Sequence, residues 1–241
     1  MANPTETVLI TGTNRGIGYG LTKHFARRGW RVFSACRKPA EAAELQALAK
    51  EFPEKIEILQ VEVRDDASVA ALGQAVAART ASLDLLVNNA GIMPGEDSER
   101  AGTLSLAPIL DAFDVNVAGV IRVTQAVLPL LRLGSRPRIV NITSGGGSLK
   151  AETFRRHYSY SLSKAALNMF TRRAAFDLKG AGFTVVCVSP GFIQTDMARA
   201  WGADLPLDEA TEVLARTFSD LKPEQNGQWI DRFGQPSEFA W

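Results

Sequence analysis

A tyrosine and a lysine four residues apart, in Tyr160-Ser-Leu-Ser-Lys164, are the pair best suited to do chemistry in this chain. On an α-helix, residues at this spacing share a face, with Cβ atoms about 5–6 Å apart. A free phenol ionises near pH ~10, and a neighbouring cation favours the phenolate. We therefore expect Lys164 to lower the pKa of Tyr160, so that the phenol can exchange a proton with a carbonyl or an alcohol. The alternative is a tyrosine that packs on the core beside a solvated lysine.

A glycine-rich turn, residues 11–18 (TGTNRGIG), fits the phosphates of a dinucleotide. It follows a predicted strand and opens a predicted helix. Gly12 permits a tight turn, Gly16 lets the backbone approach a pyrophosphate, and Gly18 lets the helix pack closely on the strand. Free N–H groups at the helix start then favour the phosphates. The spacing differs from G-x-G-x-x-G, so we interpret it as a related but distinct dinucleotide loop; the alternative is an ordinary glycine-rich turn.

The end of the second predicted strand discriminates between the two nicotinamide dinucleotides. A site for NAD usually carries an acidic residue there, about 20 residues after the loop, for the ribose hydroxyls. Here the sequence is Ser34-Ala-Cys-Arg37-Lys38, and the next acid is Glu41. The guanidinium groups of Arg15 and Arg37 suit the oxygens of a 2′-phosphate. The pattern favours NADP(H) over NAD(H), against the alternative of two exposed arginines.

The elements that position these residues alternate along the chain. Short apolar runs, several of them continuous, predict parallel strands that are buried on both faces; they span residues 7–11, 31–36, 56–63, 83–88, 138–143, 184–189 and 228–230. Amphipathic stretches predict helices over 16–28, 40–51, 66–80, 106–133, 158–179 and 207–220. This alternation predicts an α/β, doubly wound parallel sheet with ligands at the carboxyl ends of its strands. Residues 92–103 and 192–206 are expected to form long loops at that edge.

Composition limits the kinds of partner. The net charge of +1, with 46% hydrophobic and 22% charged residues, is typical of a globular protein and does not favour a nucleic-acid or membrane partner. Cys36 and Cys187 lie in apolar runs and predict neither a disulfide framework nor a metal site, so a reducing compartment is the default. His24 and His157 lack clustered ligands, and we expect no metal. No leader or membrane-length apolar stretch is evident, which predicts a cytoplasmic protein.

Taken together, these motifs resemble the short-chain dehydrogenase/reductase family along nearly the whole chain. Besides the glycine loop, the matching segments are Asn88-Asn89-Ala90-Gly91, Val-Asn116-Val-Ala-Gly, Ile-Val-Asn-Ile-Thr-Ser144, the Tyr160–Lys164 pair and Pro190-Gly191-Phe-Ile193-Gln-Thr195. Within the family, residues 163–168 and 186–197 and the ending at Trp241 resemble the branch that contains C-factor and the sniffer carbonyl reductase. The resemblance implies one Rossmann-type domain over residues 1–241, with a seven-stranded parallel sheet and helices on both faces.

The resemblance also implies roles for individual residues. Tyr160 would donate a proton to the carbonyl oxygen, Ser144 would donate a hydrogen bond to the same oxygen, and Lys164 would lower the phenol's pKa and bind the nicotinamide ribose. Asn116 would hold a water that connects Lys164 to solvent; the alternative is a buried amide that satisfies helix backbone. The cofactor-binding residues would be Gly12, Asn14, Arg15, Gly16, Ile17, Gly18, Arg37, Glu62, Val63, Asn89, Ala90, Gly91, Tyr160, Lys164, Pro190, Gly191, Ile193 and Thr195. The long helices near 106–133 and 158–179 would make the contacts of a homodimer or homotetramer.

Two features depart from the family's pattern. Glu62-Val63 stands where the family usually has Asp-Val beside the adenine, and the interval between Ser144 and Tyr160 is longer than usual. The sequence is therefore interpreted as an NADPH-dependent carbonyl reductase, or an alcohol dehydrogenase running in reverse. The first alternative is a C-factor-like regulatory or signalling protein that binds nucleotide with little turnover. The second is an epimerase or dehydratase of the longer relatives, for whose substrate domain little chain remains.

Overall fold

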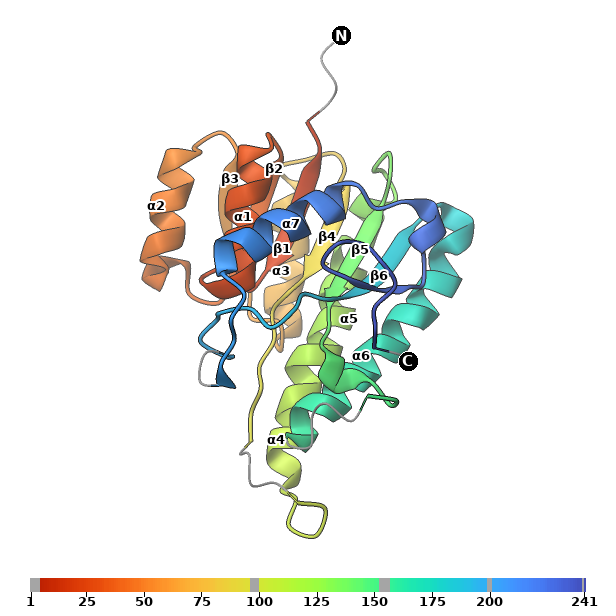
Figure 1. Ribbon diagram of the computed structural model, residues 1–241. Helices are drawn as coiled ribbons and strands as arrows, with labels where there is room; N and C mark the ends of the chain where they lie inside the picture. Colours follow the sequence, from red (N-terminus) through yellow and green to blue (C-terminus); the bar gives the residue numbers. More distant parts are fainter. Residues whose placement is uncertain (1–4, 96–99, 152–156, 199–200, 240) are drawn as a thin grey trace.

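The computed structural model describes residues 5–95, 100–151, 157–198, 201–239 and 241 as an α/β fold with a central sheet between two layers of helices (Figure 1). Within these residues, seven parallel strands form one sheet in the order β3-β2-β1-β4-β5-β6-β7. The strands are β1 (Thr7–Thr11), β2 (Arg31–Cys36), β3 (Ile56–Gln60), β4 (Leu85–Asn88), β5 (Arg138–Ile142), β6 (Thr184–Ser189) and β7 (Trp229–Asp231). The predicted doubly wound parallel sheet is confirmed.

Helices cover both faces of the sheet. They are α1 (Gly16–Arg27), α2 (Ala43–Glu51), α3 (Asp66–Ala77), α4 (Leu106–Phe113), α5 (Gly119–Leu131), α6 (Tyr158–Leu178) and α7 (Leu207–Ser219). The division follows the two-residue period of a strand. Val8 and Ile10 of β1 face a core formed with α1, α2 and α7, whereas Leu9 faces a second core formed with α3, α5 and α6. The strand order reverses between β1 and β4, which is where such sheets bind ligands.

Several predicted elements have different bounds in the structure, and two of them differ most. The strand predicted over 56–63 ends at Gln60, because the backbone beyond it bonds to nearby side chains: the N–H of Glu62 donates to Ser68 Oγ at 2.9 Å, and Asp65 caps α3 through the N–H of Ser68 at 2.6 Å. The helix predicted over 106–133 contains a π-helical turn, Asp114–Ala118, between α4 and α5. Parts of three predicted loops lie outside the described residues. These parts are residues 96–99 of the loop predicted over 92–103, residues 152–156 of the insertion over 145–157, and residues 199–200 of the loop predicted over 192–206.

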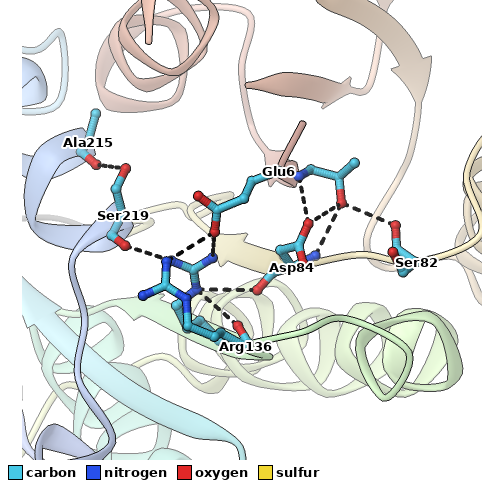
Figure 2. A network of polar contacts seen from close by, with 8 residues as sticks. Glu6, Ser82, Asp84, Arg136, Ala215 and Ser219 are labelled. Carbon is cyan, nitrogen blue, oxygen red and sulfur yellow. Dashed lines mark hydrogen bonds and ion pairs between the residues drawn. The ribbon is translucent and has the colours of Figure 1, made fainter. Parts of the chain in front are cut away.

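A buried arginine, Arg138, connects segments at the amino-terminal ends of the strands. The glycine turn lies at the opposite, carboxyl-terminal ends. Arg138 is 1% exposed, and its guanidinium donates to Glu6 Oε1 at 2.5 Å and to the carbonyl oxygen of Ser219 at 2.7 Å. It also lies over the ring of Trp30, 5.2 Å from the centroid. Figure 2 shows the surrounding network, in which Asp84 accepts hydrogen bonds from the backbone N–H and side chain of Thr7. This network joins the start of β1, β4 and β5 to the end of α7.

Candidate active site

The glycine-rich turn between β1 and α1 packs against the segment that follows β4. Gly12 has a φ of +72°, which favours glycine, and an added Cβ there would lie 2.8 Å from the Cα of Ala90. An added Cβ at Gly18 would lie 2.3 Å from the carbonyl oxygen of Gly12. Helix α1 can therefore start directly beneath the turn only because residue 18 has no side chain. Asn89 fixes the turn, because its Nδ2 donates to the carbonyl oxygens of Thr11 and Gly12 at 2.9 and 3.0 Å. The turn is a rigid backbone cradle with a helix start beneath it, as phosphate binding requires.

A cavity of about 1370 Å³ opens at the carboxyl ends of the strands, in front of this turn. Most residues predicted for the site line it, although they come from widely separated parts of the chain; these are Gly12, Asn14, Arg15, Gly16, Ile17, Arg37, Glu62, Val63, Asn89, Ala90, Gly91, Ser144, Tyr160, Lys164, Pro190, Gly191, Ile193 and Thr195. Gly18 and Asn116 are the predicted residues that do not line it. Both are buried.

Tyr160 and Ser144 face the cavity from different elements. Tyr160 lies in the first turn of α6, and Ser144 lies two residues beyond the end of β5. Burial raises the pKa of Tyr160 to about 12, and the Ser144 hydroxyl offsets only part of this shift. The expected lowering of this pKa is therefore wrong for the protein without ligand. A phenol with this pKa keeps its proton across the neutral range and is a weaker acid than a free phenol.

Lys164 is 5% exposed and lies one helical turn after Tyr160. Its Nζ donates to the carbonyl oxygen of Ile142 at 2.8 Å and lies 5.4 Å from the centroid of the Tyr160 ring. Burial lowers the pKa of Lys164 to about 8. The predicted shared helix face is thus observed, but burial, which disfavours the phenolate, is the largest influence on the pKa of Tyr160.

Asn116 lies in the π-helical turn and is completely buried. Its Nδ2 donates to the carbonyl oxygen of Ile92 and to Ser163 Oγ, both at 2.9 Å, and its Oδ1 accepts from the N–H of Ile92 at 2.9 Å. The side chain therefore joins the segment after β4 to helix α6, and both its N–H donors are used within the protein. The backbone that this buried amide satisfies belongs to Ile92, in the segment after β4. π-turns of this kind often occur at functional sites.

Three charged residues flank the cofactor end of the cavity. Arg15 is 67% exposed and pairs with Asp196, with the guanidinium and carboxylate 2.7 Å apart, so the glycine turn is joined to the segment after β6. Arg37 is exposed at the end of β2. Glu62 is turned back toward its own loop, because its Oε1 accepts from the backbone N–H of Arg64 at 3.2 Å. Arg15 and Arg37 both line the cavity.

The structure adds residues to the cavity that no motif identified. His157, Trp201 and Phe239 line it near Tyr160, and the rings of His157 and Trp201 lie 5.0 Å apart. His157 has a φ of +63°, which is unusual for a residue other than glycine and occurs most often at functional positions. Trp201 belongs to the long loop predicted after β6, so loop length was the available signal for it. Phe239 comes from the carboxyl-terminal tail, for which the sequence offered none.

The described part of the chain holds neither a candidate metal cluster nor a helix suited to span a membrane. No three histidine, cysteine, aspartate or glutamate side chains gather there so as to hold a metal ion. None of the helices described is long and apolar enough to cross a membrane.

Comparison with known proteins places the geometry in context. A family model described as short chain dehydrogenase matches residues 6–206. The C-signal protein of Myxococcus xanthus is 38% identical over 162 residues, which are 67% of this chain and 95% of that protein.

Two solved structures resemble the fold closely. An NADPH-bound carbonyl reductase from chicken fatty liver has a TM-score of 0.90 and 31% identity, and the match covers 98% of this chain and 99% of that one. The carbonyl reductase Sniffer of Drosophila melanogaster also has a TM-score of 0.90 and 31% identity, with coverage of 99% and 100%. The resemblance predicted from the motifs is confirmed, including its C-factor and sniffer-like relatives.

Proposed function

This chain belongs to the short-chain dehydrogenase family of oxidoreductases, and from that premise we propose that it is an NADPH-dependent carbonyl reductase. One observation carries the proposal: Tyr160, Ser144 and Lys164 line the same cavity as the glycine turn and the two arginines. A proton donor, an oxygen-binding hydroxyl and a dinucleotide cradle therefore face one space. The reverse reaction, oxidation of an alcohol, would use the same groups in the opposite sense.

The residues present fit NADP(H). The backbone cradle at Gly12, Asn14, Gly16 and Ile17 would hold the pyrophosphate at the start of α1, where Gly18 allows the close packing. Arg15 and Arg37 would bind the 2′-phosphate. The rest of the cofactor would lie along Glu62, Val63, Asn89, Ala90, Gly91, Pro190, Gly191, Ile193 and Thr195. When bound, NADPH supplies the hydride that the protein itself cannot provide.

The reacting end of the cavity is built from the chain's own groups. Ser144 would donate a hydrogen bond to the carbonyl oxygen and stabilise the negative charge that develops there. Tyr160 would donate its phenolic proton to the same oxygen. Lys164 would stabilise the resulting phenolate and bind the nicotinamide ribose. The remaining lone pair of Asn116 Oδ1 would accept a hydrogen bond from the water through which Lys164 is reprotonated.

Exposed apolar side chains on α4 and α6 support a homo-oligomer. Leu106, Leu110, Met169 and Phe176 are 70%, 66%, 61% and 75% exposed. Apolar patches of this kind often mark contacts between subunits. We propose that these two helices make the contact of a homodimer or homotetramer, as the resemblance to the family implies.

A regulatory role is the second candidate, and similarity to the C-signal protein favours it. A protein that only binds nucleotide has no evident need for a proton donor and a hydroxyl at one end of the cavity. The filled positions of Tyr160, Lys164, Ser144 and Asn116 therefore favour the enzyme.

The discriminating experiment is a direct assay of the purified chain. We expect NADPH, and NADH less well, to be oxidised in the presence of members of a panel of aldehydes, ketones and quinones. Loss of the absorbance of the reduced cofactor reports turnover, and omission of the carbonyl compound gives the background. NADPH binding without turnover across the whole panel would exclude the carbonyl reductase and favour the regulatory protein.

A further inference from the structure

The carboxyl-terminal tail folds back onto the sheet and reaches the candidate active site. After β7 the chain reverses, with an antiparallel bridge between Ile230 and Pro236 and a hydrogen bond from the N–H of Ser237 to the carbonyl oxygen of Trp229 at 2.9 Å. This reversal directs Glu238 and Phe239 into the cavity that Tyr160 lines. The tail is thus part of the wall of the site.

Phe239 meets the site at the residue next to Ser144. If Gly145 carried a Cβ, that atom would lie 2.6 Å from Cζ of Phe239, which is closer than two non-bonded carbon atoms can approach. The ring edge therefore rests on the bare Cα of Gly145. A substrate whose oxygen is bound by Ser144 and Tyr160 would have this ring beside it.

A set of aromatic contacts holds Phe239 in this place. Its ring stacks on Trp229, with centroids 5.9 Å apart and an angle of 29° between the planes. Trp229 is itself fixed, because it is 4% exposed and its Nε1 donates to Ser189 Oγ at 2.8 Å. Trp241 packs on Trp229 at 5.6 Å, and the guanidinium of Arg172 lies 5.0 Å from the centroid of Trp241. A ring supported in this way is a preorganised surface.

We propose that Phe239 contacts the substrate and selects carbonyl compounds that carry a flat apolar group. This inference rests on the proposed reductase function and deepens it. The rings of Trp201 and His157 line the same cavity, so they would add aromatic surface for a flat apolar substituent. A small aliphatic carbonyl compound would leave the ring of Phe239 uncovered.

The first test replaces Phe239 and compares two probes, acetophenone and propanal. Phe239→Ala should lower kcat/KM for acetophenone relative to propanal by about tenfold or more, because removing part of an apolar pocket changes discrimination by that order. Phe239→Leu should recover part of the preference. Phe233→Ala, which removes a 52% exposed phenylalanine of the same tail that does not line the cavity, is the matched control and should leave the ratio of the two kcat/KM values unchanged. An unchanged ratio in Phe239→Ala would overturn the proposal.

The second test needs no turnover and so separates this inference from the proposed function. Acetophenone binding to the complex with NADP⁺ is measured by calorimetry for the wild type and Phe239→Ala. We expect at least tenfold weaker binding to the variant, with NADP⁺ affinity and thermal stability retained. Equal affinity, or no acetophenone binding to either protein, would overturn the role of Phe239, whereas binding without turnover would overturn the reductase function alone.

The contact with Gly145 offers an independent check. The Cβ added in Gly145→Ala would meet Cζ, the terminal ring carbon of Phe239. The substitution therefore forces this end of the Phe239 ring to move. The substitution should alter the acetophenone preference in the wild-type background by more than about threefold. It should have little effect when combined with Phe239→Ala, because the ring is then absent. Equal effects in both backgrounds would contradict the proposed contact.

Discussion

The guanidinium of Arg15 lies 2.7 Å from the carboxylate of Asp196 and so joins the glycine turn to the segment after β6. Arg15 is also one of the two cations proposed to bind the 2′-phosphate. The carboxylate of Asp196 therefore binds the same guanidinium, that of Arg15, to which the phosphate would bind.

Asp196→Asn should consequently strengthen NADPH binding. Exposed ion pairs contribute about 0.2–1 kcal/mol, so release of Arg15 should lower the Kd for NADPH by no more than about fivefold. The Kd for NADH should change little, because it has no 2′-phosphate. Fluorescence titration of both cofactors measures the effect, with Asp204→Asn, an exposed carboxylate on the same loop that does not line the cavity, as control. A parallel change for NADH would contradict this competition.

Arg37→Ala should act in the opposite direction. A charge-assisted hydrogen bond contributes about 1.5–3 kcal/mol, so NADPH binding should weaken by about tenfold or more while NADH binding is retained. The adjacent Lys38→Ala is a close control, because Lys38 pairs with Glu41 at 3.0 Å and does not line the cavity. An equal loss of affinity for both cofactors would remove the reason for placing the phosphate at Arg37.

Tyr160→Phe should abolish most turnover while leaving the cofactor site intact. The substitution keeps the ring but removes the proton donor, and general acid catalysis contributes about 10²–10⁴-fold. We expect a loss of at least about 100-fold in kcat and less than about a threefold change in the Kd for NADPH. Tyr158→Phe removes the same atom two residues away, from a side chain that is 36% exposed and does not line the cavity, and should be neutral. Retained turnover in Tyr160→Phe would contradict the assigned role.

Lys164→Met should make the protein more stable at neutral pH. Burial lowers the pKa of Lys164 from 10.5 to about 8, so below pH 8 the folded state contains a charge that the unfolded state solvates better. Between about pH 8 and 10.5 the unfolded chain binds more protons at this group, and the wild type gains stability as the pH rises. The stability difference between Lys164→Met and the wild type should therefore be about 3 kcal/mol at pH 7 and smaller by about 2 kcal/mol at pH 9.5.

Urea unfolding of both proteins at each pH measures this difference. Subtracting wild type from variant removes the opposite trend expected from Cys187, a thiol whose pKa is raised by burial in both proteins. A difference that stays constant between pH 7 and 9.5 would show that Lys164 titrates at its ordinary pKa in the folded protein.

Arg138→Ala should destabilise the fold strongly without touching the site. Its guanidinium is 1% exposed, and its removal leaves the carbonyl oxygen of Ser219 without this partner. Loss of a charge-assisted hydrogen bond to this carbonyl reduces the free energy of unfolding by about 1.5–3 kcal/mol. Arg136→Ala is the matched control, because Arg136 is 57% exposed and bonds to the same Glu6 oxygen at 3.2 Å. It should change stability by less than about 1 kcal/mol; similar losses in both variants would contradict the importance of burial.

The sequence predicted the sheet well because its signals are local. Continuous apolar runs indicate strands that are buried on both faces, and the glycines of the turn are needed for backbone contacts within and beside it, such as that between Gly12 and Ala90. The four-residue spacing of Tyr160 and Lys164 likewise fixes their shared helix face. These features depend on residues close in the chain or on a repeated pattern.

Other features of the site depend on contacts between distant segments. The pKa of Tyr160 rises instead of falling because burial, which the sequence does not encode locally, outweighs the hydrogen bond to Ser144. The side chain of Asn116 bonds to Ile92 and Ser163, which are 24 and 47 residues away. Phe239 reaches Gly145 only because the tail reverses after β7. No spacing in the sequence indicates any of these contacts.

The π-helical turn makes the chain sensitive to a change of length at one point. The hydrogen bonds of a π-turn span one residue more than those of an α-helix, so deletion of a single residue from Asp114–Ala118 would leave an ordinary α-helical turn between α4 and α5 and would displace Asn116. The amide of Asn116 would then swing away from Ile92, although no chemical group near the cavity had been altered. At this position the protein would tolerate many exchanges of side chain better than the loss of one peptide unit.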